Sequence, residues 1–467
     1  MLSLIRRNKL FFFTFTLLGL LLRAYFLHWH FLFEGDSLVY GDLARNWLLH
    51  GVYGMTDNGV LIPLDIRMPG YPAFLVASFR LFGVEHYGAV VRIQVIVDLL
   101  TCLVIAAHAR RLHSERAAKI AFALATLCPF TADYTATPLP ETLAIFSGAT
   151  ALFFALRALQ RMRVAPPWDV AHSFALGGWF LCGLGIALSI YIRPDGGVLL
   201  AAIGLYLLWL AVRQHDAEYV WTTVLLGIVS LLPLLPWTIR NWRTLHQIEP
   251  LAPFYAQVPG EYVPRGFNRW SKTWVVDFIS VMNVEWNVSS EGNGDRVDIN
   301  QIPPRAYDNP QQRQRTEQIF QNYNQRLDLT PEMDSEFAQL AAERIRAHPF
   351  RYYIELPLAR LADMWLRPRT EMLPPSSRWY EFDDDRKWIV LAVGLAVLNL
   401  IYVAAAIAGL IRGRPIAWAG LGIYYIVLRS LFLGTMQNPE SRYTLECFPV
   451  VIWFASALWR RSIHAHV

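Results

Sequence analysis

The sequence predicts an all-α polytopic membrane protein built as a bundle of about ten transmembrane helices. Of its 467 residues, 54% are hydrophobic and only 17% are charged, against about 25% charged residues in soluble proteins. The mean hydropathy is +0.29. Apolar runs of about 20 residues recur along the chain, and this is the length that crosses the hydrocarbon core of a bilayer.

The predicted spans follow from these apolar runs. They lie at 10–33, 87–109, 117–133, 141–158, 172–192, 196–213, 219–238, 387–411, 415–435 and 443–461. Clusters of Lys and Arg, which favour the cytoplasmic side, all fall on one side when every span is counted. The first is Arg6, Arg7 and Lys9, and the last is Arg460 and Arg461. Both termini are therefore predicted to be cytoplasmic.

The same count places five segments on the opposite, outer side of the membrane. They are 34–86, 134–140, 193–195, 239–386 and 436–442. The chain divides accordingly into an N-terminal transmembrane module at 1–240, an outer region at 241–386 and C-terminal transmembrane helices at 387–467. Loops on one face of a rigid scaffold commonly carry function, so the outer segments are where a site is expected.

The first outer segment predicts a helix that lies on the membrane. Asp36 or Ser37 can cap its start and Gly51 can end it. Its apolar residues share one face, and Asp42 is expected to be solvated on the other face. A second short helix is predicted from Pro72 onward.

The outer region 241–386 predicts a loop-like first half followed by two helices. A helix is expected at 331–347, with Pro331 in its first turn. An amphipathic helix at 350–366 should be kinked by Pro357. It carries Arg360 on its polar face, and we expect this helix to lie at the membrane interface.

Asp36 is the leading catalytic candidate because it directly follows the first span. One interpretation is structural, since Asp is a preferred helix cap. The other makes it a general base that takes a proton from an acceptor. The two are compatible, because a cap would also hold the carboxylate in place. Glu34 is a weaker acidic candidate in the same segment.

Three arginines are candidate phosphate ligands, because a guanidinium offers a planar fork to phosphate oxygens. Arg67 lies in the motif RMPGYP at 67–72, which also contains Tyr71. Arg193 precedes Pro194 and could instead extend toward the headgroups. Arg442 could merely pair with Glu440. Together in one outer cavity, the three would form a strong anion site.

Other polar residues have structural and functional interpretations that the sequence leaves open. Glu141 could complement a helix dipole or line the cavity. The neighbours Arg240 and Asn241 could anchor the interface or contribute to the site, and Tyr443 is a further cavity candidate. Asp98 and Arg429 are intramembrane charges, which are usually paired.

The cysteines and histidines do not indicate a metal site. Cys102, Cys128, Cys182 and Cys447 lie in or beside apolar runs and are interpreted as small buried side chains. On a helix, His28 and His30 would diverge. The sequence therefore requires no cofactor, and a divalent metal near Asp36 is possible but not indicated.

The order of these motifs resembles that of GT-C glycosyltransferases, in particular the dolichyl-phosphate-mannose protein mannosyltransferase and aminoarabinose transferase group. The resemblance spans the chain. It rests on the acid after the first span, on the motif at 67–72, and on Pro140-Glu141, Arg193-Pro194, the run at 236–241 and the run at 440–443. The mannosyltransferases carry an adjacent Asp-Glu pair where this chain has Glu34-Gly35-Asp36, so protein O-mannosylation is not implied.

The resemblance implies a GT-C transmembrane bundle and a polyprenyl-phosphate sugar donor, used on the outer side with inversion. It assigns Asp36 to the acceptor and Arg67, Arg193 and Arg442 to the donor phosphate, with Glu141 and Glu440 as cavity residues. The expected location is a bacterial inner membrane, with the site facing the periplasm or exterior. Membrane lipids are the expected surroundings, the acceptor is a lipid, glycan or protein, and no nucleic acid is expected.

A transporter or flippase of a lipid-linked sugar is the alternative from a different functional class. It would account for the spans and the cavity arginines. It accounts less well for the long outer region and for the lack of the internal repeats that many transporters show. Transfer of a sugar from a polyprenyl phosphate is therefore the favoured function.

Overall fold

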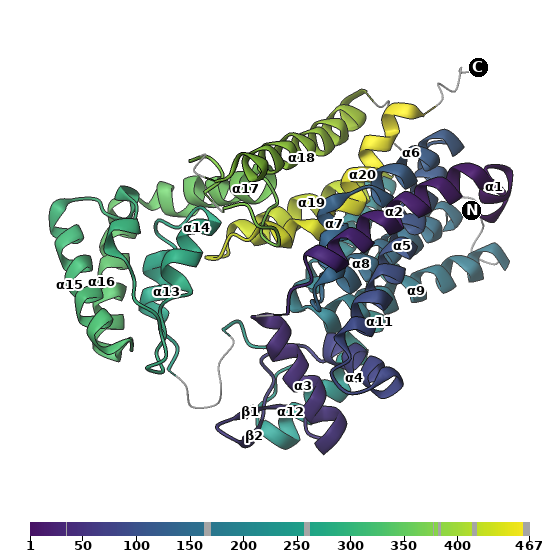
Figure 1. The fold of residues 1–467 in the computed structure, drawn as a ribbon. Coiled ribbons are helices and arrows are strands. Elements are labelled where there is room, and N and C mark those ends of the chain that lie inside the picture. Colours follow the sequence, from purple (N-terminus) through teal and green to yellow (C-terminus); the bar gives the residue numbers. More distant parts are fainter. Residues whose placement is uncertain are drawn as a thin grey trace. The chain divides into compact units, whose positions relative to one another are not determined.

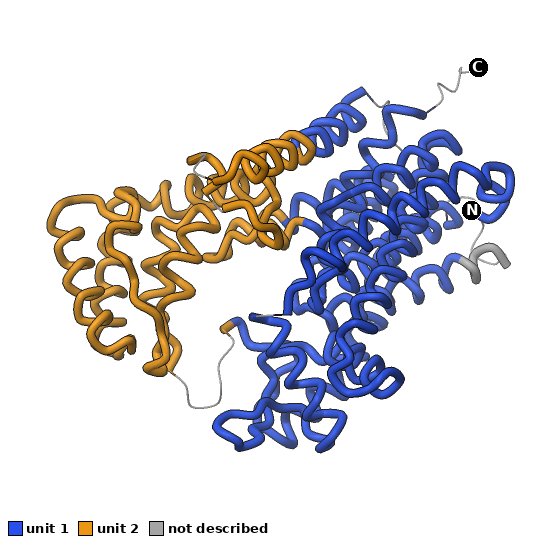
Figure 2. The backbone as a smooth tube through the Cα atoms, viewed as in Figure 1, with its two compact units in different colours: residues 1–254, 400–429, 445–467 blue, residues 255–399, 430–444 orange. Residues whose placement is uncertain are grey.

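The computed structural model describes residues 1–33, 35–162, 170–255, 262–376, 378–381, 384–412 and 418–460, without the side chains of 170–174. Nearly all regular elements among these residues are helices (Figure 1). The predicted all-α class is confirmed. The chain forms two compact units, coloured separately in Figure 2. Unit 1 comprises residues 1–254, 400–429 and 445–467, and unit 2 comprises residues 255–399 and 430–444.

Unit 1 contains a bundle of helices, the longer of which are apolar. They are α1 (Leu2–Arg7), α2 (Lys9–Trp29), α5 (Tyr87–Leu112), α6 (Glu115–Thr126), α7 (Pro129–Asp133), α8 (Glu141–Met162), α9 (Val170–Ile192), α10 (Gly197–Gln214), α11 (Glu218–Leu231), α12 (Leu235–Leu245) and α20 (Phe448–Ser456). Helix α8 packs against α5 and α9, and α11 packs against α9 and α10. Helix α20 is almost wholly buried and packs against α5 and α6.

Seven helices in the described part of the chain are long and apolar enough to cross a membrane. They are Lys9–Trp29, Tyr87–Leu112, Glu141–Met162, Ala175–Ile192, Pro194–Gln214, Glu218–Leu245 and Arg386–Arg412. The three other predicted spans correspond to shorter apolar helices. One is divided into α6 and α7 before Pro129, one is α19 (Ala419–Gly434), and one is the 3-10 turn Ser441–Cys447 followed by α20.

The first loop of unit 1 carries two helices and a hairpin. They are α3 (Asp36–His50), α4 (Gly70–Phe82) and the strands β1 (Gly54–Asp57) and β2 (Val60–Pro63). The predicted cap of α3 is wrong. Gly35 is the N-cap with φ +54°, a conformation that suits glycine, and Asp36 is the first helical residue. Gly51 ends α3 in the left-handed conformation, as predicted. Helix α4 begins two residues before the expected Pro72.

Asp42 ties the hairpin to α3, so the expectation that it is merely solvated is wrong. Its carboxylate accepts from the Thr56 backbone N–H at 2.7 Å and from Asn46 Nδ2 at 3.2 Å. Asn46 also donates to the Gly54 carbonyl at 3.1 Å. The strands pair antiparallel, Gly54 opposite Pro63 and Asp57 opposite Val60. Asn58 and Gly59 form the turn with φ +47° and +79°.

Unit 2 has its own aromatic core. Its helices are α13 (Arg265–Ser271), α14 (Phe278–Ser280), α15 (Pro310–Arg326), α16 (Pro331–Ala347) and α17 (Leu356–Leu366), and parts of α18 (Arg386–Arg412) and α19 belong to it. Trp270, Trp274, Phe320 and Phe337 are fully buried in this core. The predicted helix at 331–347 is confirmed as α16. The loop-like interpretation of the first half of the region is wrong for α13. Helix α15 was not predicted, and the buried faces of both helices build the core.

The predicted helix at 350–366 begins as a π-helix, Arg351–Glu355, and continues as α17. Arg360 does not lie on a solvated face, because its side chain is fully buried. It donates to the Val275 carbonyl at 2.8 Å and also to the carbonyls of Lys272 and Gly434. A buried guanidinium thus satisfies backbone groups that would otherwise be left without partners.

Candidate functional site

The first functional pair joins Asp36 to Arg67. Asp36 opens α3, and Arg67 lies on the segment between β2 and α4. Arg67 Nη2 donates to Asp36 Oδ1 at 2.7 Å. The side chains are 31% and 24% exposed, so both remain accessible to a ligand. The sequence-predicted acid and the first predicted phosphate ligand are therefore direct neighbours.

The backbone around Arg67 is held independently of its side chain. The Tyr53 hydroxyl donates to the Arg67 carbonyl at 2.8 Å. Three residues on, Gly70 passes so close to the end of α9 that a Cβ there would lie 2.5 Å from the Tyr191 carbonyl oxygen. Close packing therefore explains the glycine in the motif at 67–72, since only a residue without a side chain fits there.

Tyr40 lies one turn after Asp36 on α3 and beneath Arg67. The Arg67 guanidinium carbon is 5.8 Å from the centre of the Tyr40 ring, within range of a cation–π contact. Burial raises the pKa of Tyr40 to about 12, and the charges of Arg67, Asp36, Arg193 and Glu141 also act on the phenol. Tyr40 is therefore a neutral hydroxyl at physiological pH.

The second group is a buried cluster of two arginines and three carboxylates, here called the arginine–carboxylate cluster. Its members are Glu141, Arg193, Asp195, Arg429 and Glu446, from the ends of α8 and α9, from α19 and from the turn before α20. Every side chain in it is at most 16% exposed. Such a cluster fixes the ends of several helices to one another.

Arg193 is held by carboxylates on several sides. Its Nη1 donates to Glu141 Oε1 at 3.0 Å, and its Nε lies 3.2 Å from Asp195 Oδ1 and 3.5 Å from Glu446 Oε1. The formal charge of the whole cluster is negative, so the environment of Arg193 does not favour a phosphate. Its role as a phosphate ligand stays a prediction.

The sequence reasoning missed Glu446 and did not connect Asp195 with Arg429. A usable signal was present, because a charge inside an apolar span needs a partner. The same rule applies to Asp98 in α5, which accepts from Arg23 Nε at 2.8 Å. Arg23 also donates to the Thr126 carbonyl at 2.9 Å and to the Gly19 carbonyl at 2.8 Å.

Arg240 and Asn241 hold the first loop in place. Arg240 Nη1 donates to the Leu64 carbonyl at 2.7 Å, and its Nη2 donates to the Tyr53 carbonyl. Asn241 is fully buried and donates from Nδ2 to the Glu249 carbonyl at 2.8 Å. These contacts support the anchoring interpretation and place Leu64 and Glu249 beside the same end of α12.

Asp65 lies next to this anchor and is 7% exposed. Burial raises the pKa of Asp65 to about 6, and a hydrogen bond with the Glu249 carboxyl raises it further, while Arg240 lowers it. The sequence analysis did not single out Asp65. Its position two residues before Arg67 could have marked Asp65 as a candidate.

Arg442 belongs to unit 2, and its contacts there include Glu440. Arg442 Nη2 donates to Glu440 Oε1 at 3.2 Å, and the Tyr443 hydroxyl donates to the same oxygen at 2.8 Å. Asn438 Nδ2 is a third donor at 2.9 Å. The three predicted residues of this run are thus in contact, and Glu440 accepts from both of the others.

Tyr71 is fully buried and does not present its hydroxyl to an open site. It donates to Gln94 Oε1 at 2.8 Å, and Gln94 Nε2 donates onward to the Thr137 carbonyl at 2.8 Å. The ring packs edge-on against Tyr40, with centres 5.1 Å apart. Glu34 lies outside the described residues. In the described part of the chain, no group of three or more His, Cys, Asp or Glu side chains is arranged to hold a metal.

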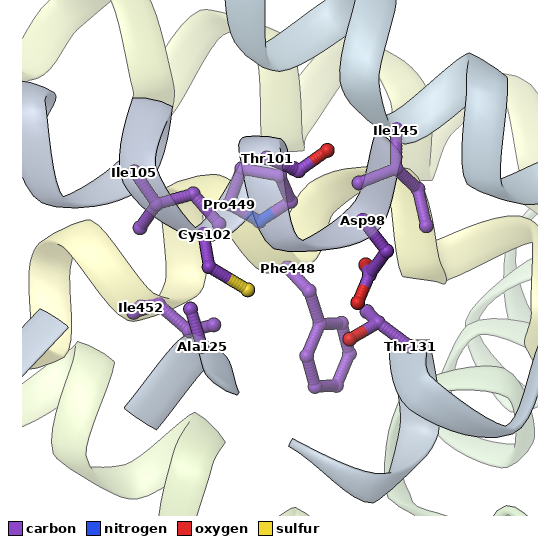
Figure 3. Close-up of a pocket in the computed structure, with 10 residues that line it drawn as sticks. All are labelled: Asp98, Thr101, Cys102, Ile105, Ala125, Thr131, Ile145, Phe448, Pro449 and Ile452. Carbon is purple, nitrogen blue, oxygen red and sulfur yellow. The ribbon is translucent and has the colours of Figure 1, made fainter. Parts of the chain in front are cut away.

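A small cavity inside unit 1 lies beside Asp98, the partner of Arg23 (Figure 3). It is lined by Asp98, Thr101, Cys102, Ile105, Ala125, Thr131, Ile145, Phe448, Pro449 and Ile452. The space suffices for about one water molecule. A sugar or a lipid phosphate does not fit, so this cavity is not the site of a group-transfer reaction.

Comparisons with known proteins found one family model that matches part of the chain and several solved structures with a similar fold. A family model described as dolichyl-phosphate-mannose-protein mannosyltransferase matches residues 67–237. This match includes Arg67, Glu141 and Arg193. A search of curated protein sequences found no match.

Several solved structures resemble the whole chain at low sequence identity. ArnT from Cupriavidus metallidurans bound to undecaprenyl phosphate is 15% identical, with 95% of this chain and 77% of that chain covered and a TM-score of 0.42. The apo oligosaccharyltransferase of Archaeoglobus fulgidus is 14% identical over 95% of this chain, with a TM-score of 0.50, and this chain covers 50% of its length. The resemblance to GT-C enzymes predicted from the sequence is confirmed, and the protein has the GT-C membrane fold.

Proposed function

We propose that this protein is a glycosyltransferase that moves a sugar from a polyprenyl-phosphate donor to an acceptor, with inversion at the anomeric carbon. The observation that carries the proposal is the 2.7 Å contact between Asp36 and Arg67. It brings together, in a partly exposed position, a base for the acceptor and a cation for the donor phosphate. The match to mannosyltransferases over 67–237 and the GT-C fold support the reaction class.

The reaction needs one proton acceptor and one stabiliser of the leaving group. The acceptor oxygen or nitrogen attacks the anomeric carbon and forms the new bond there. Its proton passes to the Asp36 carboxylate. The bond between the anomeric carbon and the phosphate oxygen breaks, and the lipid phosphate leaves with the electron pair. Arg67 stabilises the charge that develops on this phosphate.

The charge distribution of the sequence supports a site on the extracytoplasmic face, with both termini in the cytoplasm. For a bacterial cell, this side is the periplasm or the exterior. The arginine–carboxylate cluster is proposed to keep the bundle rigid behind the site, because rigid support improves the geometry of catalytic groups.

The test uses purified protein in lipid nanodiscs, radiolabelled polyprenyl-phosphate sugars and a crude envelope extract as the source of acceptor. Wild type is expected to transfer label, and Asp36→Asn is expected to lose at least about a hundredfold in rate while still binding the lipid. Asp57→Asn is the matched control, since Asp57 lies exposed at the tip of the hairpin in the same loop.

Equal turnover by Asp36→Asn would remove the base role. Movement of the labelled lipid across vesicle membranes without any transfer would instead favour the transporter. Loss of transfer in both Asp variants would indicate damage to the loop rather than to the chemistry.

A further inference from the structure

We infer that the donor phosphate frees Asp36 for catalysis by drawing Arg67 away from it. This inference rests on the proposed function, in which Asp36 is the base and Arg67 a phosphate ligand. The Asp36–Arg67 contact then belongs to the resting state, and it is exchanged for an Arg67–phosphate contact when the donor binds.

The first reason is electrostatic. A carboxylate that accepts a proton loses its attraction to a neighbouring guanidinium. While Arg67 Nη2 stays 2.7 Å from Asp36 Oδ1, proton uptake by Asp36 therefore costs the free energy of that ion pair. Moving the guanidinium to another anion removes this cost at the step where a proton must be accepted.

The second reason is geometric, since the backbone of Arg67 is held by contacts that do not involve its guanidinium. The exchange leaves that backbone in place and moves only the guanidinium, whose Nη1 also donates to the Ile66 carbonyl at 3.1 Å. The Arg67 carbonyl accepts from Tyr53 at 2.8 Å, and Gly70 is confined against Tyr191. Arg67 and Asp36 are 24% and 31% exposed, so solvent and ligand reach both. The centre of the Tyr40 ring lies 5.8 Å from the guanidinium carbon, so the guanidinium can keep its contact with this ring when it shifts toward a phosphate.

The third reason is competition between anions for one cation. The phosphodiester of the donor carries one negative charge, as a carboxylate does, and offers two unbridged oxygens to the guanidinium fork. The lipid phosphate that is released is a monoester and carries a larger charge. The carboxylate–arginine pair is partly open to solvent, where such a pair is worth about 1 kcal/mol, so a phosphate can compete with Asp36 for Arg67.

The exchange also resets the enzyme. After transfer, Asp36 carries the acceptor's proton and Arg67 holds the lipid phosphate. When the lipid phosphate leaves, Arg67 returns to Asp36 and favours its ionised form, so the proton passes to solvent. Product release and recovery of the base are then one event. The donor must also bind before the acceptor can be deprotonated.

Linkage provides a test that does not depend on turnover, because Asp36 and the phosphate compete for Arg67. The dissociation constant of undecaprenyl phosphate is measured for the full-length protein in nanodiscs. Four proteins are compared: wild type, Asp36→Asn, Arg67→Gln and the double variant. Asp36→Asn is expected to bind about fivefold more tightly than wild type, as expected for loss of a competing exposed pair.

The double variant separates exchange from simple charge repulsion. If Asp36 acts through Arg67, then Asp36→Asn has no effect on the dissociation constant in the Arg67→Gln background. Equal tightening in both backgrounds would show repulsion alone and would overturn the inference. Unchanged or weaker binding by Asp36→Asn would overturn it too. Asp57→Asn controls for the loss of one charge in the same loop, and thermal unfolding of each variant controls for folding.

The two proposals fail in different ways. If wild type neither binds undecaprenyl phosphate nor transfers label from any of the polyprenyl-phosphate sugars, the proposed function falls. If wild type binds the lipid and transfers sugar but Asp36→Asn leaves the dissociation constant unchanged, the exchange falls and the glycosyltransferase stands.

Discussion

Arg429 donates from Nη2 to Asp195 Oδ2 at 2.9 Å, and the same nitrogen lies 2.8 Å from Glu446 Oε1. One fully buried arginine therefore holds two carboxylates that come from distant parts of the chain. Each of these carboxylates also lies near Arg193. The ends of α9, α10 and α20 thus meet at a shared set of charges.

Replacing Arg429 should be strongly destabilising, because Asp195 and Glu446 would remain buried without one of their counter-charges. Arg429→Gln is expected to lower the free energy of unfolding by about 3–5 kcal/mol. Thermal unfolding in detergent measures the loss. Arg412→Gln is the control, since Arg412 is exposed at the end of α18. Similar melting temperatures for the two variants would contradict a stabilising role of the cluster.

Arg240→Gln should loosen the first loop without unfolding the bundle. The variant loses the donors to the Leu64 and Tyr53 carbonyls, each worth about 1.5–3 kcal/mol when the donor is charged. Amide hydrogen exchange at 53–66 is expected to rise at least about tenfold. Arg243→Gln is the control, because Arg243 lies three residues further along α12 and is exposed. This variant should leave the exchange rates at 53–66 unchanged. Faster exchange throughout the bundle would point to global unfolding instead.

Asp65 should make the protein less stable as the pH rises toward neutrality. Burial raises its pKa to about 6, above the ordinary value of about 3.9, so the folded state binds the proton more tightly. This contribution to stability is complete below pH 4 and is lost as the pH rises through about 6. In melting curves from pH 4 to 8, Asp65→Asn should remove this part of the slope. Parallel curves for the two proteins would refute the assignment.

Gly70→Ala should destabilise the junction between α4 and α9. The new Cβ would lie 2.5 Å from the Tyr191 carbonyl oxygen, and forcing the backbones apart costs about 1–3 kcal/mol. Gly88→Ala is the matched control, because the nearest atom to a Cβ there is 3.6 Å away. The control should melt at the wild-type temperature or slightly above it. A wild-type melting temperature for Gly70→Ala would show that the motif's glycine is not required for packing.

The positions of most long helices could be predicted from the apolar runs, because a helix that crosses a bilayer needs about 20 apolar residues. The predicted span 87–109 became Tyr87–Leu112, and 387–411 became Arg386–Arg412. The hairpin was missed although Asn58-Gly59 is a strong turn signal. The flanking strands have only four residues each, too few for an alternating pattern to stand out.

The candidate site was only partly predictable. Asp36 and Arg67 were named individually, but their contact joins residues 31 positions apart, which local patterns do not reveal. The contact of Arg193 with Glu446 could not be predicted, because Glu446 is contributed by the turn before α20, far along the chain. Side-chain partners across several hundred residues follow from packing and not from spacing.

The buried pair of Arg23 with Asp98 has a consequence for biogenesis. Arg23 sits within α2 and finds its counter-charge, Asp98, in α5. An arginine alone in a membrane helix costs about 2.5–3.5 kcal/mol on insertion scales. While the ribosome is still making the first loop, α2 therefore enters the bilayer at a disadvantage. Its stable insertion should wait until residue 98 has emerged, because α2 is made before the helix that carries its counter-charge.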